Sequence, residues 1–343
     1  MSNALFPPPP EFEVGNDLNI GDLKWFLLTM MRIREFEERV GELVAQNKIV
    51  TPCHLCTGQE AVAAGVCRAL ARDDYVFGNH RSHGHYLAKG GDLRAAMAEV
   101  FGKSTGCSGG RGGSMHLTAP EVGILGTSSI VSGSIAIAVG SALAESIRGG
   151  KRVTAVFHGD SVPEEGIWHE SANLAALKRL PVIFICEHNL YCAHMPLDRR
   201  RVRDNLSAVA GGHGLSSVTV DGNNVLAVYY AAQDAVKKAR EGCGPVFIEC
   251  RTYRWHGHVG PNDDADMGLR SRAEIDVWRE RCPIKCFSGF LIETGLLSGQ
   301  AVAEMRALAG AEVDEAVGFA AGSPYPDPQD LTKYVFKEGG QWL

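Results

Sequence analysis

The sequence has no excess of positive charge and few aromatic residues. Its 343 residues include 34 Lys and Arg against 40 Asp and Glu, a net charge of −6, and aromatic residues make up 8%. Nucleic-acid-binding domains usually present a basic face, so this balance argues against a nucleic-acid partner. With 45% hydrophobic residues, the chain is long enough for one large α/β domain with appendages, or for two domains.

No segment has the character of a membrane span or of a cleaved leader. Residues 122–144 contain no charge, but they include four glycines and six serines or threonines, which is too polar for lipid. A loop followed by a buried helix is the better interpretation, and one face of that helix would consist of small residues: Gly133, Ala136, Gly140 and Ala144. The N-terminus is rich in proline and acidic residues, unlike a secretory or transit peptide. This composition predicts a poorly ordered N-terminal arm or one that lies along the surface.

Several familiar signatures are also missing. No Gly-x-Gly-x-x-Gly follows an expected strand, which disfavours a dinucleotide-binding site. Cys53 and Cys56 resemble half of a zinc motif, but no second pair has the matching spacing. The ten cysteines are therefore expected to be reduced thiols, and the protein is expected to be cytoplasmic.

Two short apolar runs rich in β-branched residues, 153–158 and 182–186, are separated by a segment with helical periodicity. This pattern predicts a β-α-β unit whose parallel strands end at one edge of a sheet. Asp160 follows the first run and Asn189 the second, so both side chains are expected to face one crevice. Their oxygen atoms suit Mg²⁺, which usually binds phosphates as well. The alternative is an ordinary crossover with two polar loop ends.

The connecting helix has its own signals. Residues 161–164 fit a capping box, and Pro181 is expected to end the helix before the second strand. Apolar residues at helical spacing are expected to form its buried face: Ile167, Leu174 and Leu177, widened by Trp168, Ala172 and Ala175.

Further strands are expected at residues 75–77, 217–220 and 246–250, with helices between and around them. Alternating strands and helices indicate an α/β fold with a doubly wound, mainly parallel sheet. We expect an N-terminal arm over residues 1–20, one main domain over 21–290, and a C-terminal helical extension with a tail over 291–343. Residues 109–115 are expected to form a flexible glycine-rich loop.

Histidine and arginine cluster twice, at residues 79–85 and 251–258, each time directly after an expected strand. Both clusters should therefore lie on the sheet edge that carries Asp160 and Asn189. Arginine and histidine donors together with Mg²⁺ are the groups that a diphosphate requires. Either cluster alone could be a solvated basic loop; two clusters beside a metal corner favour an anionic phosphate ligand.

Five phrases of the sequence resemble one family, the alpha subunit of the decarboxylating, thiamine diphosphate-dependent component of 2-oxo acid dehydrogenase complexes. The phrases cover residues 54–61, 80–85, 110–116, 173–177 and 253–258, in addition to Asp160 with Asn189 and Tyr191. The resemblance runs from about residue 20 to about residue 290. It implies a thiamine diphosphate-binding fold in which this chain is the diphosphate-binding module.

The resemblance implies a role for each matching residue. The side chains of Asp160 and Asn189 and the carbonyl of Tyr191 would bind Mg²⁺, and Ser161 is the third residue of the cofactor motif. Arg81 and His258, with His80 beside them, would contact the diphosphate. His54 and His258 would line the reacting centre and transfer protons. Backbone contacts to the aminopyrimidine would come from Ser129 and Val131.

The implied cofactors are thiamine diphosphate and Mg²⁺, and the implied partners are a beta subunit in an α₂β₂ heterotetramer and a lipoyl acyltransferase. The apolar, glycine-lined helix over residues 130–144 is a candidate element of the interface with the beta subunit. The substrate would be a pyruvate-like 2-oxo acid or acetoin. The chain departs from the family at several positions: Ser129 and Ser161 replace glycines, His188 replaces an asparagine, and Val259 replaces a regulatory serine. Two alternatives therefore stay open, a carboligase using the same cofactor and a scaffold subunit without catalysis.

Overall fold

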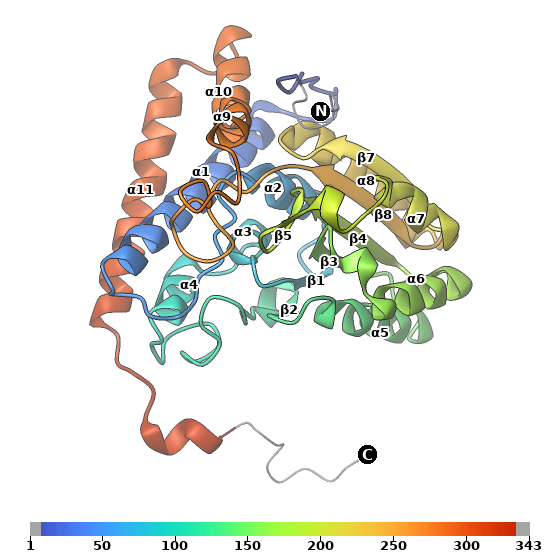
Figure 1. Ribbon diagram of the computed structural model, residues 1–343, viewed down its shortest axis with the longest axis horizontal. Helices are drawn as coiled ribbons and strands as arrows, with labels where there is room; N and C mark the ends of the chain where they lie inside the picture. Colours follow the sequence, from blue (N-terminus) through green and yellow to red (C-terminus); the bar gives the residue numbers. More distant parts are fainter. Residues whose placement is uncertain (1–7, 334–343) are drawn as a thin grey trace.

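The computed structural model describes residues 8–333, which form a parallel sheet between two layers of helices (Figure 1). Six strands lie in the order β2-β1-β3-β4-β8-β7, and every neighbouring pair is parallel. The strands are β1 (Tyr75–Gly78), β2 (Ile124–Thr127), β3 (Thr154–Gly159), β4 (Val182–His188), β7 (Ser216–Asp221) and β8 (Val246–Arg251). The α/β class and the doubly wound parallel sheet expected from the sequence are confirmed.

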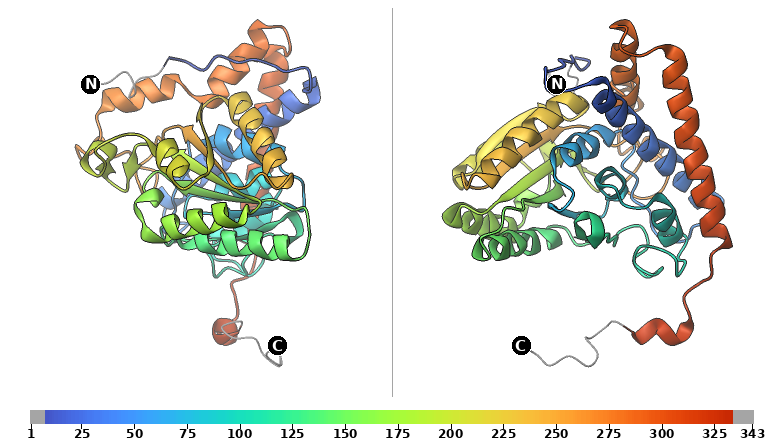
Figure 2. Two further views of the ribbon diagram at one scale, coloured as in Figure 1. Left: turned by 90° about the vertical axis from the view of Figure 1, so that its right-hand side faces the viewer. Right: turned by 180° about the vertical axis from the view of Figure 1, so that it is seen from behind.

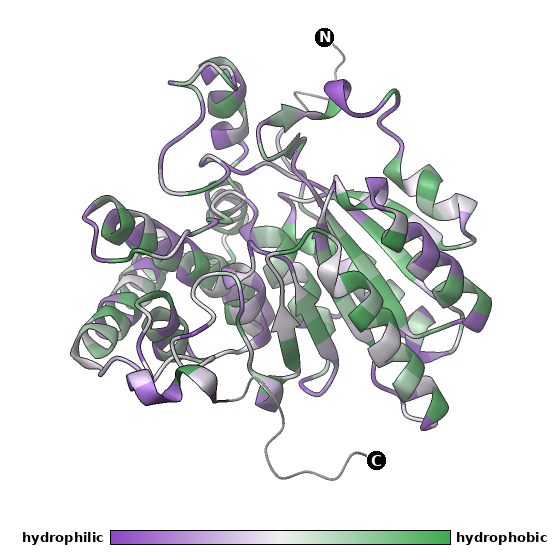
Figure 3. Ribbon diagram, turned by 60° about the horizontal axis from the view of Figure 1, so that its bottom comes forward, coloured by the Kyte–Doolittle hydropathy of each residue, from purple (hydrophilic) through white to green (hydrophobic). Residues whose placement is uncertain are grey.

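Helices cover both faces of the sheet, as the two views of Figure 2 show. One face carries α5 (Gly133–Ile147), α6 (Gly166–Lys178) and α7 (Leu206–Gly212), and the other carries α2 (Glu60–Ala69), α8 (Val225–Arg240) and the helices around them. Successive residues of β4 alternate between the two cores: Phe184 packs under α5 and α6, and Ile185 faces the opposite side. Burial on both faces explains why the central strands β3, β4 and β8 are mainly apolar, whereas the edge strand β7 is more polar and exposed (Figure 3).

The strand order reverses between β1 and β3. After β1 the chain crosses to β2 on one side, and after β3 it crosses to β4 on the other. Such a switch point leaves a crevice at the carboxyl ends of the two strands, where ligands bind in open α/β sheets. The segments that follow β1 and β3 are the first His/Arg cluster and Asp160, so the sequence places polar groups where this topology opens the sheet.

Local details differ from the sequence-based expectations. The capping box predicted at residues 161–164 is wrong: residues Val162–Glu164 form the short 3-10 helix η2, and the Ser161 side chain makes no cap hydrogen bond. The reason is that the Glu164 carboxylate pairs with Arg200 instead of turning back to the helix start. Strand β2 and the small hairpin of β5 (Tyr191–Cys192) and β6 (Met195–Pro196) were not anticipated.

Helix α5 was expected to be buried, and this is wrong for one of its faces. Ile135, Ala138, Val139 and Ala142 pack against the sheet and α6. The small-residue face points outward, where Ala136 and Gly140 are exposed and Ile137 is 61% exposed. On α6, six residues were predicted to form the buried face. Trp168, Ala172 and Ala175 are buried as predicted, but the prediction is wrong for the other three, which are exposed: Ile167, Leu174 and Leu177. Together these helices present an apolar outer surface.

The remaining helices lie beyond the other face and around the ends of the sheet: α1 (Ile20–Ala45), α3 (His83–Lys89), α4 (Leu93–Val100), η1 (Pro120–Val122), η3 (Leu197–Arg199), α9 (Arg272–Glu280), α10 (Pro283–Glu293), α11 (Gly299–Gly322) and η4 (Pro328–Thr332). The long helix α11 packs along α1 and α4 and buries Val313 and Ala316 in the same core (Figure 1). The division at residue 290 stays a prediction. Within residues 8–333, no helix has the length and apolar character needed to span a membrane.

The N-terminal arm lies on the protein where it is described. Phe12 and Val14 pack against a cluster formed by α1, α8 and α10, and the backbone N–H of Gly15 donates to the Tyr230 hydroxyl at 2.6 Å. Residues 1–7 of the predicted arm and residues 334–343 of the predicted tail lie outside the described part of the chain.

Candidate active site

A cavity of about 170 Å³ lies at the carboxyl ends of β1, β3 and β4, at the switch point. All the site residues predicted from the sequence line it: His54, His80, Arg81, Ser129, Val131, Asp160, Ser161, Asn189, Tyr191 and His258. Larger hollows of about 520, 640 and 380 Å³ lie beside α11, under the N-terminal arm and at the C-terminal end of α5, and none of the three contains this combination of groups. The structure brings the predicted residues together, and their individual roles stay predictions.

Three oxygen donors meet at one corner of the cavity. Asp160 follows β3 and is 1% exposed, and Asn189 follows β4 and is 7% exposed. Leu190 has a φ of +73°, a left-handed conformation that brings Tyr191 back beside Asn189. The Asn189 amide nitrogen donates to Gln59 Oε1 at 3.3 Å, which fixes the orientation of the amide. A carboxylate, an amide oxygen and a nearby backbone carbonyl are a donor set that fits Mg²⁺.

Buried positive charge lies next to this corner. Arg81 is 4% exposed, and its guanidinium donates to two backbone carbonyls, Leu55 O at 2.5 Å and His258 O at 3.3 Å. Within residues 8–333 no carboxylate lies within 4.0 Å of its nitrogens; burial lowers the pKa of its side chain, and the charges of the more distant Glu187 and Glu37 offset this only in part. A buried cation without a counter-ion is unfavourable, so this site favours an anionic ligand. The alternative of a solvated basic loop is therefore wrong.

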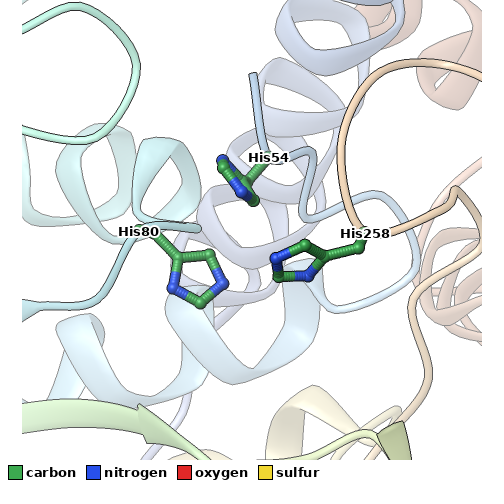
Figure 4. A group of neighbouring side chains, drawn as sticks. All are labelled: His54, His80 and His258. Carbon is green, nitrogen blue, oxygen red and sulfur yellow. The ribbon is translucent and has the colours of Figure 1, made fainter. Parts of the chain in front are cut away.

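Three histidine rings point toward one another across the cavity (Figure 4). The ring centroids of His54 are 4.7 Å from His80 and 4.8 Å from His258, and those of His80 and His258 are 5.4 Å apart. Burial, followed by the charge of Arg81, lowers the pKa of His54 to about 3, of His80 to about 2 and of His258 to about 4. Neutral imidazoles can accept and donate protons. They are also zinc ligands, but the adjacent arginine favours an anion instead.

These depressed pKa values predict that acid destabilises the protein. An unfolded chain begins to bind protons at its histidines near pH 6.5, whereas the folded rings stay neutral to about pH 4. The contribution of these neutral rings to the free energy of unfolding is therefore fully present above about pH 6.5 and is lost as the pH falls below it. A fully buried histidine would lose about 1.4 kcal/mol per pH unit; because these rings are partly solvated, we expect about 1–2 kcal/mol for all three between pH 6.5 and 5.5.

The measurement is urea unfolding at several pH values without cofactor. His80→Phe should flatten the acid slope, whereas His116→Phe, at an exposed ring, should leave it unchanged. An identical slope for His80→Phe and the unmodified chain would contradict the assignment.

The glycine-rich loop was expected to be flexible, and the structure shows it to be held by one carboxylate. Glu99, which is fully buried at the end of α4, accepts four backbone N–H groups of this loop. Ser108 and Gly110 donate to Oε2 at 2.8 and 2.9 Å, and Gly112 and Gly113 donate to Oε1 at 2.7 and 3.0 Å. The carboxylate satisfies the donors that the turns leave unpaired. The loop thereby holds Met115 at the cavity wall.

Other lining residues had no role assigned from the sequence. Glu187 lies just before the His188-Asn189 pair, and its carboxylate accepts from Asn79 Nδ2 at 3.2 Å and lies 3.1 Å from His85 Nε2. Arg254 is 1% exposed, and its pKa is lowered to about 9 by burial and then by Arg81. The only sequence signal for Glu187 and Arg254 was that each lies close along the chain to a predicted site residue, Asn189 or His258. The remaining unassigned wall residues are Asn79, Met115, Gly159, Cys192 and Ala193.

His83 and His256 lie outside the cavity. The His83 ring bridges Glu37 Oε2 at 3.0 Å and Ser114 Oγ at 2.9 Å, and the Nδ1 atom of His256 lies 2.6 Å from the Pro261 carbonyl oxygen. The His83 ring therefore links α1 and α3 to the glycine-rich loop, and the His256 ring holds together the segment that follows β8. The ten cysteines are all free, including the Cys53 and Cys56 pair, as the sequence predicted.

A parallel sheet with oxygen donors and buried cations at its switch point defines a phosphate-binding α/β protein. The chain matches the dehydrogenase E1 component family over residues 28–329, and it belongs to that family. Family members use thiamine diphosphate, with Mg²⁺ as the usual metal partner.

Individual relatives agree with this membership. The chain is 38% identical to the alpha subunit of acetoin:2,6-dichlorophenolindophenol oxidoreductase from Bacillus subtilis, over 91% of this chain and 92% of the relative. It is 36% identical to the alpha subunit of the pyruvate dehydrogenase E1 component from Porphyra purpurea, over 94% and 96% of the two chains. The corresponding subunit from Rhizobium meliloti is 36% identical over 88% and 86%.

Proposed function

We propose that this chain is the alpha subunit of a thiamine diphosphate-dependent 2-oxo acid dehydrogenase and binds the diphosphate end of the cofactor with Mg²⁺. One observation carries the proposal: Arg81 is buried without a counter-ion, in the same cavity as the oxygen corner of Asp160 and Asn189. A diphosphate with bound Mg²⁺ provides partners for both features. Its oxygens would bind the Mg²⁺ held by Asp160 and Asn189, and they would accept hydrogen bonds from Arg81.

The metal would be held by the side chains of Asp160 and Asn189 and the backbone carbonyl of Tyr191, with Ser161 beside them on the cavity wall. Arg81 would donate to the diphosphate, with His80 and His258 as further donors. Each of these groups is already positioned by the fold, so cofactor binding needs little ordering of side chains. Contacts to the aminopyrimidine are assigned to the backbone of Ser129 and Val131, at the exposed rim of the cavity.

When bound, thiamine diphosphate supplies a nucleophilic carbon that adds to a keto group and accepts the electron pair released with carbon dioxide. The histidines of this chain would manage the protons of that reaction. His54 and His258 are held neutral, so either ring would hydrogen-bond the substrate's keto oxygen and relay the proton that this oxygen gains on addition and loses when the acyl group leaves. Walls of buried side chains would keep bulk water away from the reacting centre.

The cavity points to a second chain. Ligand pockets commonly measure about 300–1,000 Å³, and the 170 Å³ present here would take only part of the cofactor. Its rim at Ser129 and Val131 is exposed and continues into the outer face of α5, where Ile137 is 61% exposed. We propose that a beta subunit covers this face and completes the site, in an α₂β₂ heterotetramer that can deliver acyl groups to a lipoyl acyltransferase. Ten free thiols fit the cytoplasm as its compartment.

Gly140 gives a test of this interface. A Cβ atom added there meets no other atom, so Gly140→Glu should leave the isolated chain folded and slightly more stable, by about 0.5–1 kcal/mol. In an interface, the buried carboxylate would cost about 3–5 kcal/mol, a hundredfold or more in association. We expect size-exclusion chromatography to show loss of the heterotetramer.

The matched control is Gly318→Glu on α11, another exposed glycine with open space around it. This variant should assemble normally. A Gly140→Glu chain that still forms the full heterotetramer would show that the beta subunit does not bind this face of α5.

The activity is tested with the full chain co-purified with its beta subunit. Pyruvate and acetoin are offered separately, with dichlorophenolindophenol or a lipoyl domain as acceptor, and dye reduction and acyl transfer are measured. We expect turnover that depends on thiamine diphosphate and Mg²⁺. Acyloin products without any acceptor requirement would instead support the carboligase alternative, and an inactive complex that binds no cofactor would support the scaffold alternative.

A further inference from the structure

Arg200 binds the predicted metal ligand Asp160 from outside the cavity. It follows η3, in the connection between β6 and α7, and its side chain is 6% exposed. Its Nη2 donates to Asp160 Oδ2, and its Nη1 lies 3.5 Å from the Asp160 backbone carbonyl oxygen. Asp160 belongs to the cavity wall and Arg200 does not, so the guanidinium contacts the carboxylate on the side that faces away from the ligand.

The other carboxylate oxygen is left for a ligand. No residue between 8 and 333 donates a hydrogen bond to Asp160 Oδ1. The two oxygens therefore have separate surroundings: Oδ2 is held by Arg200, with His188 Nε2 at 3.9 Å, and Oδ1 is free. A carboxylate that binds a metal through one oxygen commonly has its second oxygen held by a hydrogen bond, which fixes the ligand's orientation.

The charge of Arg200 is balanced by a second carboxylate. Its Nη1 donates to Glu164 Oε1 at 2.5 Å, and the neighbouring Arg201 lies 3.8 Å from the same oxygen. The guanidinium of an arginine stays protonated in proteins, so Arg200 meets both carboxylates as a cation. An unbalanced cation would repel Mg²⁺; because Glu164 offsets it, the orienting effect of Arg200 is expected to dominate.

We infer that Arg200 is a positioning residue for the metal site: it fixes the Asp160 carboxylate so that Oδ1 faces the cavity. This inference rests on the proposed function, because it assumes that Asp160 binds the cofactor's Mg²⁺. Arg200 also connects the metal ligand to the segment between β6 and α7, so the sequence of that segment contributes to metal affinity without lining the cavity. Glu164 takes part as the residue that holds and neutralises the arginine.

The test measures metal binding directly. The full chain, purified with its beta subunit and saturated with thiamine diphosphate, is titrated with Mn²⁺, and free Mn²⁺ is followed by electron paramagnetic resonance. Arg200→Met should raise the dissociation constant for Mn²⁺ by about 10- to 100-fold, the range for residues that orient metal ligands. Arg200→Lys should recover part of this loss, because lysine keeps the charge but cannot bridge both carboxylates with a planar fork.

Arg201→Met is the matched control, since Arg201 shares the contact with Glu164 but does not contact Asp160. It should change Mn²⁺ binding by less than about twofold, because it removes a positive charge near the site but no contact of Asp160. At saturating Mg²⁺, turnover of Arg200→Met should return to near that of the unmodified enzyme, which a general loss of structure would not allow.

Two outcomes would overturn the inference in different ways. If Arg200→Met binds Mn²⁺ as tightly as the unmodified complex, or more tightly, Arg200 does not position the ligand, and the proposed function is untouched. If the unmodified complex binds neither Mn²⁺ nor thiamine diphosphate, the proposed function fails, and this inference fails with it.

Discussion

Asp160→Asn is expected to abolish Mg²⁺-dependent cofactor binding. Asp160 is the buried carboxylate of the oxygen corner, and asparagine has nearly the same shape without the charge. Mg²⁺ dehydrates reluctantly and relies on carboxylates, so loss of this ligand should weaken thiamine diphosphate binding by at least about 100-fold. Calorimetric titration of the cofactor into the complex of this chain and its beta subunit, with and without Mg²⁺, measures the change.

Asp204→Asn is the matched control for this prediction. Asp204 lies 3.6 Å from His188 and pairs with Arg251, so it belongs to the adjacent charged network, but it does not line the cavity. This variant should bind the cofactor normally. Unchanged, Mg²⁺-dependent binding by Asp160→Asn would remove Asp160 from the metal site.

Arg81→Met is expected to have two effects of opposite sign. Cofactor affinity should fall at least about 150-fold and by up to about 25,000-fold, because two hydrogen bonds to a charged diphosphate contribute about 1.5–3 kcal/mol each. The cofactor-free protein should become slightly more stable, because removing a buried cation that forms no ion pair is expected to outweigh the loss of its hydrogen bonds to Leu55 O and His258 O. The first effect is measured by calorimetric titration and the second by urea unfolding without cofactor.

Arg270→Met is the contrasting control. Arg270 is equally buried, but its Nε lies 3.4 Å from Asp264 Oδ2 and its Nη atoms donate to three backbone carbonyls. Its removal should therefore lower the free energy of unfolding rather than raise it. If Arg81→Met destabilises the cofactor-free chain as Arg270→Met does, Arg81 has a structural role, and the argument for an anion site loses its main support.

The sheet and the site cluster could be predicted from the sequence because both depend on short-range patterns. Runs of β-branched residues indicate buried strands, and polar residues directly after such runs lie at one edge of a parallel sheet. Asp160, Asn189, Arg81 and His258 each follow a strand in this way. Strand β2 gave no such signal, since a glycine interrupts its apolar residues after two positions.

The supporting residues could not be predicted, because their contacts join distant segments. Arg200 meets Asp160 across 40 positions, and nothing in the pattern around either residue indicates the pairing. Glu99 looks in the sequence like an ordinary acidic residue near the end of a helix. Only the folded turns of the following loop show that its carboxylate accepts hydrogen bonds from four backbone N–H groups. The exposure of one face of α5 could not be separated from burial, although the helix was a candidate interface element, because small apolar residues are equally typical of a buried helix and of an interface.

The central claim is that this chain supplies the metal and diphosphate half of a cofactor site that a second chain completes. The most direct measurement is calorimetric titration of Mg²⁺ and thiamine diphosphate into this chain alone, into the beta subunit alone, and into the two together. Our account predicts tight binding by the pair only, with affinity at least about 100-fold weaker for either chain alone. Equally tight binding by the isolated chain, accompanied by decarboxylation of a 2-oxo acid, would contradict it.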